Sequence, residues 1–300
     1  MQALTFYLAY PFIYAIALMP FRMLYIVSDV LCLLLKASGY RKKVIVQNLR
    51  NSFPEKDDAA ISDLCNRYYR YLCDLTLETL KTIRMSERSA KKRCVFHNQP
   101  WLDQLYAERK SIMIVMGHHG NWEWAGPGFT LHTKHQLVVV YRPLKHPYFE
   151  KMMVRARTRF GTQITPVDKT LRDMMANQNK ITATAFIADQ VSMLKNADWM
   201  TFLNQETAIY TGYERLAQKF NYPVVYMRVT RVKRGYYEVT PELLFMNPKD
   251  TGANEIAETF MKKLEQDIIK DPVPWLWSHR RWKHVRKNHA KAENLVAVNA

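Results

Sequence analysis

The residues that most constrain the fold of this chain are the five apolar residues Ile112–Met116 and the polar residues that follow them. An unbroken apolar run of this length, rich in β-branched residues, is typical of a strand buried on both faces of a parallel sheet. Gly117 ends the run, and Asn121 is placed to cap a helix that begins near Trp122. The sequence therefore predicts a strand, a loop and a helix in succession. In open α/β sheets, ligands bind at the strand ends that such loops form.

The loop carries the residues that indicate chemistry. His118 and Glu123 are five positions apart, and across a junction between loop and helix the carboxylate can fold back toward the imidazole. A histidine oriented by a carboxylate is a general base, and without a G-x-S-x-G nucleophile the substrate must supply the attacking hydroxyl. We predict His118 and Glu123 as the catalytic pair, with Gly120 and Asn121 binding the substrate. The alternatives are a histidine that only caps or hydrogen-bonds, and a metal ligand, for which no second cluster of ligands is present.

Two further apolar segments end in a charged residue. The predicted strand from Gln136 to Pro143 carries Arg142 near its carboxyl end, and the predicted strand from Ile181 to Ala188 is followed by Asp189. An arginine at a sheet edge can bind a phosphate or stabilise an oxyanion. Its alternative role is a structural ion pair with a nearby carboxylate. Asp189 could bind an acceptor hydroxyl or hold Arg142 in place, so we predict both residues as substrate-binding.

The remaining periodicity predicts helices that alternate with short strands. Strands are expected at 95–96 and 163–166, a β-hairpin at 223–241, and helices at 57–83, 101–109, 146–159, 169–179, 210–220 and 254–270. Glu78 and Glu214 are expected as surface charges of their helices, with Glu214 as an alternative partner for the histidine. The predicted fold class is α/β, with a mostly parallel central sheet flanked by helices.

The amino-terminal residues indicate a membrane anchor. Residues 3–21 carry no charge, and the apolar character resumes after Arg22. The run approaches the length that spans a bilayer, so either one helix crosses it or two helices broken near Pro20 lie in one leaflet as a hairpin. A buried core helix pair is the alternative. We expect a membrane anchor at 1–38, a basic amphipathic helical segment at 39–90 and an α/β domain at 91–300, with the basic residues that follow the anchor on the cytoplasmic side.

A basic excess indicates an anionic partner, because 44 lysines and arginines oppose 27 acids. Nucleic acid is not expected, since no motif for it accompanies the charge. An anionic membrane surface fits the segment from Trp275 to Trp282, which mixes indoles with arginines. An acidic protein fits Lys151 and Arg155, which share one face of a predicted helix at i and i+4, with Arg159 extending the stripe.

Several motifs resemble the lipid A late acyltransferases of lipopolysaccharide assembly, a branch of the glycerolipid acyltransferases. The matching segments are Gly117-His-His-Gly-Asn-Trp-Glu123, Asn48-Leu-Arg50, Ser52-Phe-Pro54, Tyr141-Arg-Pro-Leu-Lys145, Ala188-Asp-Gln190 and His279-Arg-Arg281. The resemblance implies acyl transfer from an acyl carrier protein or coenzyme A thioester to a hydroxyl of a lipid A precursor. It also implies no metal or cofactor and a site on the cytoplasmic face of the bacterial inner membrane.

The aromatic spacer between His118 and Glu123 differs from the apolar spacer of the best-known members. It leaves other acceptors open, such as a lysophospholipid or an amino-acid lipid. A lipid-binding protein of the same fold without catalysis is the alternative from a different class.

Overall fold

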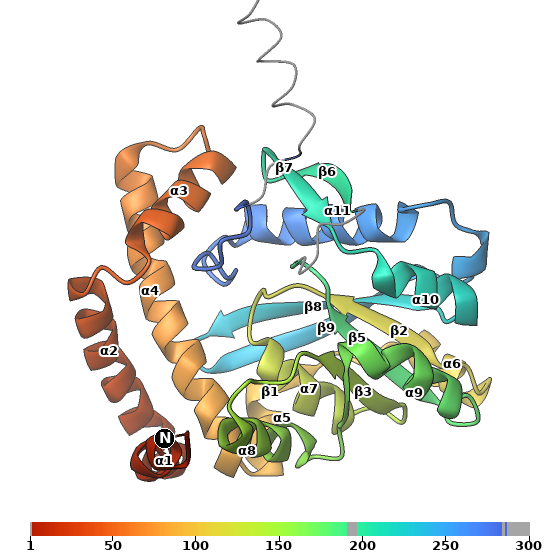
Figure 1. Cartoon of the computed structure of the whole chain (residues 1–300), viewed down its shortest axis with the longest axis horizontal. Coiled ribbons are helices and arrows are strands. Elements are labelled where there is room, and N and C mark those ends of the chain that lie inside the picture. The colour runs from red at the N-terminus through yellow and green to blue at the C-terminus, as the bar shows by residue number, and fades with distance from the viewer. Residues whose placement is uncertain (1, 191–196, 284–285, 287–300) are drawn as a thin grey trace, which may run out of the picture.

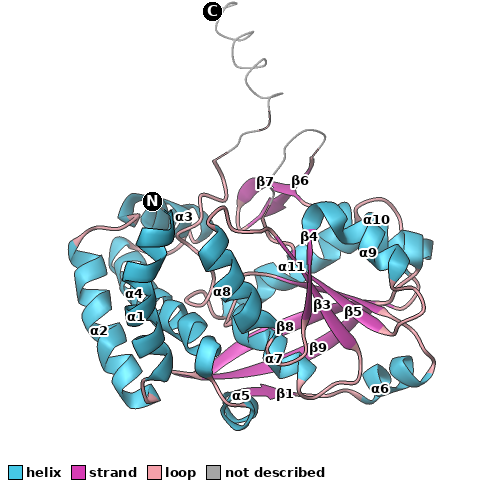
Figure 2. Cartoon of the chain, turned by 60° about the horizontal axis from the view of Figure 1, so that its bottom comes forward, coloured by secondary structure: helices cyan, strands magenta, loops and turns pink. Residues whose placement is uncertain are grey.

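A seven-stranded sheet forms the centre of the molecule in the computed structural model, which describes residues 2–190, 197–283 and 286 (Figure 2). The strand order is β1-β9-β8-β2-β5-β3-β4, and every neighbouring pair is parallel except the hairpin β8–β9. The strands are β1 (Cys94–Phe96), β2 (Ile112–Met116), β3 (Gln136–Tyr141), β4 (Gln163–Pro166), β5 (Thr182–Ile187), β8 (Val224–Lys233) and β9 (Tyr236–Phe245), and β6 (Asp198–Phe202) pairs separately with β7 (Gln205–Ile209). The predicted α/β class and mostly parallel sheet are confirmed.

Both faces of the sheet are covered, as the unbroken apolar sequence of β2 predicts. Alternate residues of β2 enter two different cores: Met113 packs on one side of the sheet and Ile114 on the other. The first core includes α10 and α11, and the second includes α5, α6 and α7. These helices are α5 (Glu87–Arg93), α6 (Pro100–Ala107), α7 (Trp122–Thr130), α10 (Gly212–Phe220) and α11 (Glu255–Lys270); α8 (Pro147–Thr158) and α9 (Thr170–Ala176) follow β3 and β4.

Four amino-terminal helices lie together beside the sheet (Figure 1). They are α1 (Gln2–Leu18), α2 (Phe21–Ala37), α3 (Lys42–Ser52) and α4 (Asp58–Lys81). The chain breaks at Pro20, and the buried Lys81 ammonium donates to the carbonyls of Ala17 and Met19 at 2.7 and 2.6 Å, which satisfies the carboxyl end of α1. The two-helix arrangement is therefore the one present, and among the described residues no helix has both the length and the apolar character to cross a bilayer.

The first two helices turn an apolar face away from the protein. Phe12 is 74% exposed and Leu33 is 68% exposed, while the opposite faces of α1 and α2 lie against α4. The exposed large residues, which we call the outer face, are Leu4, Tyr7, Leu8, Tyr10, Phe12, Leu18, Met23, Ile26, Val30, Leu33 and Leu34. A fully buried core helix pair would not expose such a face, so that alternative is wrong for this chain.

The helix α3 packs its apolar side against the rest of the protein. Its apolar residues Ile45 and Leu49 are buried, and the Asn48 amide donates to the carbonyl of Trp277 at 2.9 Å. The predicted basic amphipathic helix is therefore present, and it packs its apolar side against α4 and the carboxyl-terminal segment.

Candidate active site

The register of two neighbouring strands brings His118 to Asp189. Met116 of β2 pairs with Ile187 of β5, and His118 and Asp189 each lie two residues beyond these partners. The His118 Nδ1 and Asp189 Oδ1 atoms are 2.6 Å apart, and the backbone N–H of His118 donates to Oδ2 at 3.0 Å. Two side chains 71 positions apart in the sequence therefore form one hydrogen-bonded pair.

The carboxylate of Asp189 is buried and ionised. It is 1% exposed and accepts a third hydrogen bond, from Trp275 Nε1 at 3.0 Å. Burial by itself would raise the pKa of Asp189, but the nearby His118 charge and the hydrogen bonds from His118 and Trp275 outweigh burial and lower the pKa to about 2. An ionised carboxylate only accepts, so Nδ1 of His118 carries a proton, and in the neutral form of the ring Nε2 is the basic nitrogen.

The predicted contact between Glu123 and His118 is replaced by two other pairings. Glu123, in the first turn of α7, accepts from Arg157 of α8: Arg157 Nε donates to Oε2 at 3.0 Å and Nη2 donates to Oε1 at 2.5 Å. The imidazole of His118 contacts Asp189 and the edge of the Trp122 ring, whose centroid is 4.9 Å away. The carboxylate that orients His118 is thus Asp189. Glu123 pairs with Arg157 instead of His118 because α7 starts at Trp122 and presents Glu123 to α8.

Gly120 shapes the loop through its backbone. Its φ of +67° lies in the left-handed region, and a Cβ here would come within 2.4 Å of the Val229 carbonyl oxygen, so a side chain does not fit. Its N–H donates to the Pro274 carbonyl at 3.0 Å, and its carbonyl accepts from the Tyr71 hydroxyl. The Gly120 N–H is therefore engaged within the protein and is not available for substrate, which corrects the predicted substrate-binding role of that group.

Asn121 is a helix cap, as predicted, and it is also fully buried. Its Oδ1 accepts from the backbone N–H of Trp124 at 3.0 Å, and its Nδ2 donates to Glu78 Oε2 at 2.8 Å. Both ends of the amide are occupied by the protein. The predicted contact of Asn121 with substrate is therefore wrong, and the residue holds the loop to α4.

Glu78 is a buried carboxylate and not the surface charge that we expected. Besides Asn121 it accepts from the hydroxyl of Tyr237 at 2.7 Å and from that of Tyr25 at 2.8 Å. Burial raises the pKa of Glu78 to about 7, although these hydroxyls act in the opposite direction. Glu214 is also buried, and it accepts from the backbone N–H groups of Asn254 and Ala257 at the start of α11. Both residues therefore hold structure together.

Arg142 remains available at the sheet edge. It follows β3, the neighbour of β5, and its side chain is exposed. Glu150, a carboxylate close in sequence, accepts from the hydroxyl of Tyr141 and the backbone N–H of Leu144. Across residues 2–190, 197–283 and 286, no ion pair of Arg142 is present, which leaves its guanidinium open to a ligand. Asp189 does not hold Arg142, because both of its oxygens bind His118 and Trp275.

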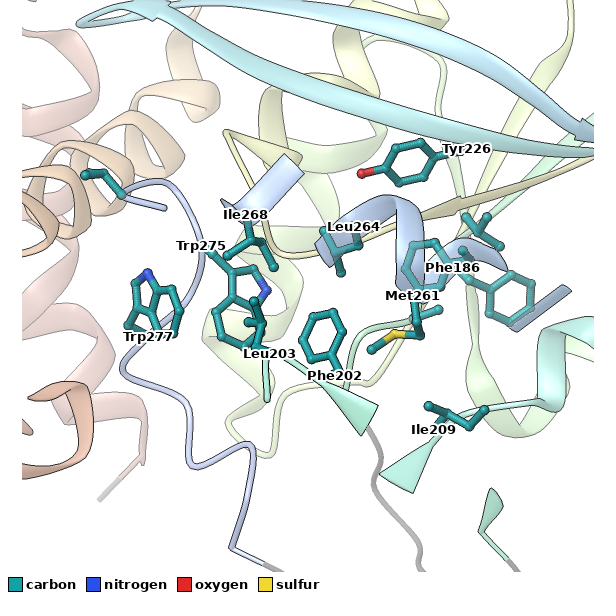
Figure 3. Packing of buried hydrophobic residues seen from close by; sticks show 14 of the residues in the cluster. Phe186, Phe202, Leu203, Ile209, Tyr226, Met261, Leu264, Ile268, Trp275 and Trp277 are labelled. Carbon is teal, nitrogen blue, oxygen red and sulfur yellow. The ribbon is translucent and has the colours of Figure 1, made fainter. Parts of the chain in front are cut away.

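The carboxyl-terminal segment forms one wall of the site and does not lie at the surface. Trp275 and Trp277 are buried, and Figure 3 shows Trp275 packed beside Phe202 and Leu203. The buried Arg281 donates to the Ala208 carbonyl at 2.6 Å. The two buried indoles correct the predicted membrane interface of this segment. The composition of the segment does not distinguish a buried wall from an interface, and the burial of Trp275 and Trp277 does.

Two other histidines border the site in different ways. The ring of His119 is 7% exposed, and its Nε2 lies 2.9 Å from the Asp271 carbonyl oxygen. Burial lowers the pKa of His279 to about 4, against the opposing charge of Asp189. His118 is the partly exposed member, with 19% of its side chain accessible. The arrangement can therefore offer one imidazole nitrogen, held in one orientation, to a hydroxyl that donates a proton. No trio of His, Cys, Asp or Glu in the described part of the chain could hold a metal ion.

Comparison with known proteins shows the family of this chain. Residues 1–284 match the family described as bacterial lipid A biosynthesis acyltransferase. The lipid A biosynthesis palmitoleoyltransferase of Escherichia coli (strain K12) and the lipid A biosynthesis acyltransferase of Shigella flexneri are each 23% identical over 248 residues, which cover 81% of this chain and 79% of the relative. Because the family match spans nearly the whole sequence, this chain belongs to the bacterial lipid A biosynthesis acyltransferases and is an acyltransferase.

Proposed function

We propose that this enzyme moves a fatty acyl group from an acyl thioester to a hydroxyl of a lipid A precursor, with His118 as the general base and Asp189 as its positioning residue. The observation that carries the proposal is the bond of 2.6 Å between His118 Nδ1 and the buried Asp189. This hydrogen bond fixes the tautomer of His118, so that Nε2 can act as the general base. Family membership supports the substrate class.

The reaction balances without a metal or cofactor. Nε2 of His118 takes the proton of the acceptor hydroxyl as its oxygen attacks the thioester carbonyl carbon. The tetrahedral intermediate collapses, the carbon–sulfur bond breaks, and the imidazolium returns the proton to the thiolate. Asp189 stabilises the imidazolium in between. We expect EDTA to leave the rate unchanged, and activity that EDTA removes and zinc restores would contradict this scheme.

Arg142 is proposed to stabilise the oxyanion or to bind a phosphate of the substrate. Its guanidinium is exposed at the same carboxyl edge of the sheet that carries His118 and Asp189. Arg142→Lys keeps the charge and loses the bidentate geometry. A fall in kcat for Arg142→Lys would indicate the oxyanion role, and a rise in KM for the lipid alone would indicate phosphate binding.

Acyl carrier protein is proposed as the donor, docked on α8. Lys151 and Arg155 are exposed one turn apart on this helix. The same helix binds Glu123 of α7 through Arg157. Acyl carrier protein is strongly acidic, and attraction between opposite charges raises association rates in a salt-sensitive way. Reversing both charges, as Lys151→Glu with Arg155→Glu, should raise KM for the carrier-protein thioester and weaken its salt dependence, with kcat unchanged.

Reversal of two basic residues on α5, Lys91→Glu with Lys92→Glu, is the matched control, because both are exposed and the net charge changes equally. An unchanged KM across a salt series for the α8 variant would exclude this docking site. Faster turnover of acyl coenzyme A than of the carrier-protein thioester would exclude the proposed donor.

The outer face is proposed to lie in the cytoplasmic leaflet of the bacterial inner membrane. It joins apolar residues of α1 and α2, and exposed Arg22, Arg41 and Lys42 flank these helices. Substituting Phe12→Glu and Leu33→Glu should release the protein from vesicles without unfolding it, because both side chains are exposed. Binding that persists in this variant, with wild-type stability, would exclude this face.

The acceptor is tested by mass spectrometry of lipids from cells that carry the wild type or His118→Ala. We expect an additional acyl chain on lipid A with the wild type only. A gain confined to a lysophospholipid or an amino-acid lipid would move the enzyme to that acceptor. Identical lipids from both strains would indicate a non-catalytic lipid-binding protein.

A further inference from the structure

A basic pocket of about 570 Å³ lies apart from His118, where α2, α4, the β8–β9 turn and the segment after α11 meet. In Figure 1 the tip of the hairpin β8–β9 points toward α4. Six cationic side chains line the pocket: Lys36, Arg67, Arg70, Arg231, Lys233 and Arg234. They come from three separate parts of the sequence, so only the tertiary fold assembles the pocket.

Two carboxylates, the buried Asp74 and the half-exposed Asp29, fix Arg231 and Arg234. Asp74 is 0% exposed and accepts from Arg231 and from Arg234, each at 2.7 Å. Arg234 also donates to Asp29 at 2.8 Å. The floor of the pocket is therefore positioned before any ligand arrives, which lowers the entropy lost on binding.

The outer cations have little or no compensation. Among the described residues, no carboxylate pairs with Lys36 or Lys233. Arg67 and Arg70 are exposed and lie 3.4 and 3.8 Å from Asp63 and Asp29. The six cations of the lining face Asp29, Asp63, Asp74 and Asp271, and the charge of the buried Glu78 also acts on Arg231. The cations still outnumber these carboxylates.

We propose that this basic pocket binds the phosphate monoester of a membrane lipid headgroup. A phosphate monoester carries about 1.5 to 2 negative charges at neutral pH and three acceptor oxygens, which suits a lining rich in unpaired cations. A phosphodiester carries one charge and two terminal oxygens, so it would engage fewer of these cations. Lysine and arginine are the side chains that bind phosphate most strongly.

The neighbouring surface identifies the ligand as a lipid. Lys36 stands in the last turn of α2, three residues after Leu33 and two after Leu34 of the outer face. A headgroup held by Lys36 would have its acyl chains along these exposed apolar side chains. A soluble phosphate would gain nothing from them.

The pocket shares a wall with the candidate active site. Asp271 and Pro274 line the pocket, and their carbonyl oxygens bind the ring of His119 and the N–H of Gly120. A ligand in the pocket would therefore lie behind the loop that carries His118. Binding itself does not depend on acyl transfer, so the proposal can be tested without turnover.

The experiment measures binding to phosphatidylcholine vesicles that contain either phosphatidic acid, a monoester, or phosphatidylglycerol, a diester, at matched surface charge. The test variant carries Lys36→Glu and Lys233→Glu, which break no ion pair among the described residues. The control variant carries Lys91→Glu and Lys92→Glu, exposed residues of α5. We expect the wild type and the control to prefer phosphatidic acid, and the test variant to lose about tenfold or more of its binding to phosphatidic acid and with it the preference.

A separate arm adds glycerol phosphate in solution. If it binds the wild type as tightly as the vesicles do, and loses affinity in the test variant, the ligand is a soluble phosphate and the lipid assignment is overturned. Equal losses in the test and control variants would show unspecific attraction to the surface charge. A wild type without preference for the monoester would also overturn the proposal. Circular dichroism of each variant checks that it is folded.

Discussion

Two buried carboxylates hold the loop of residues 117–122 from opposite sides, and they differ in the charge of their partners. Asp189 binds His118, which can carry a positive charge, and its pKa falls to about 2 even though burial opposes that direction. Glu78 binds Asn121 and two tyrosine hydroxyls, all neutral, and burial raises its pKa to about 7. Burial alone therefore does not fix the state of a carboxyl group. A partner that can be charged decides it.

This difference separates a chemical role from a structural one. The ionised Asp189 can stabilise a positively charged imidazole during the reaction. The raised pKa of Glu78 favours its neutral form, and its hydrogen bonds join α4 to α7 and the sheet. Four experiments test this division, from the largest expected effect to the smallest.

Removal of the imidazole should have the largest effect. His118→Ala is expected to lower kcat by about 10²–10⁴, because general-base catalysis contributes that much. The measurement is acyl transfer under saturating donor and acceptor, with His97→Ala as the control, since His97 is an exposed residue whose partner is Glu238. A His118→Ala enzyme that keeps wild-type kcat would remove the basis of the proposed mechanism.

Comparing Asp189→Asn with Glu123→Gln tests which carboxylate orients the histidine. Asp189 accepts three hydrogen bonds from N–H groups. The NH2 group of an asparagine in its place would face one of these donors, and two donors repel each other. We expect Asp189→Asn to lower kcat about a hundredfold or more and to alter the pH–rate profile. Glu123→Gln should have a smaller effect, because its partner is Arg157. The reverse order would assign the orienting role to Glu123.

The pH dependence of stability tests the opposite side of the loop. Glu78 has a folded-state pKa of about 7 against an ordinary value of 4.5, so its contribution is complete below 4.5 and is lost as pH rises through 7. The free energy of unfolding should fall by about 3 kcal/mol over this window, at 1.36 kcal/mol per pKa unit. The free energy of unfolding, measured by denaturant titration at several pH values, should show this fall in the wild type and not in Glu78→Gln. An equal fall in both proteins would mean that another group has the raised pKa.

The smallest effect is expected from Trp275→Phe. The change removes one hydrogen bond to Asp189, from Nε1 at 3.0 Å, and keeps an aromatic ring in the core. Loss of a hydrogen bond to a charged group costs about 1.5–3 kcal/mol. Because a donor to the ionised carboxylate is lost, the pKa of Asp189 rises toward its ordinary value, so the loss of stability in acid becomes smaller and is complete at a higher pH. If the stability of Trp275→Phe falls in acid by the same amount and over the same pH range as that of the wild type, Trp275 does not help to keep Asp189 ionised.

Much of the fold follows from local sequence. The apolar run Ile112–Met116 is β2 with the same boundaries, Asn121 caps α7, and the Lys233 to Gly235 turn joins β8 to β9. Each of these features depends on neighbours along the chain, which a sequence pattern reports directly. The break between α1 and α2 near Pro20 is of the same kind.

Long-range contacts account for the corrections. Glu78 and Glu214 resemble surface charges in a helix pattern, yet the fold buries both and supplies donors from distant segments. The tryptophans of the carboxyl-terminal segment match the composition of a membrane interface, yet they close the core beside α11. Periodicity reports which face of a helix is polar. It does not report whether another part of the chain covers that face.

The sequence by itself determined that His118 stands at the carboxyl end of a buried parallel strand, because the apolar run, the glycine and the cap are contiguous. It also placed Asp189 at the end of another strand. Only the tertiary structure decided that the two strands are neighbours in a register that makes His118 and Asp189 level, and that Glu123 turns to Arg157. The physical reason is that strand order and register are set by packing across the whole sheet, whereas spacing along the chain fixes only what lies within one element.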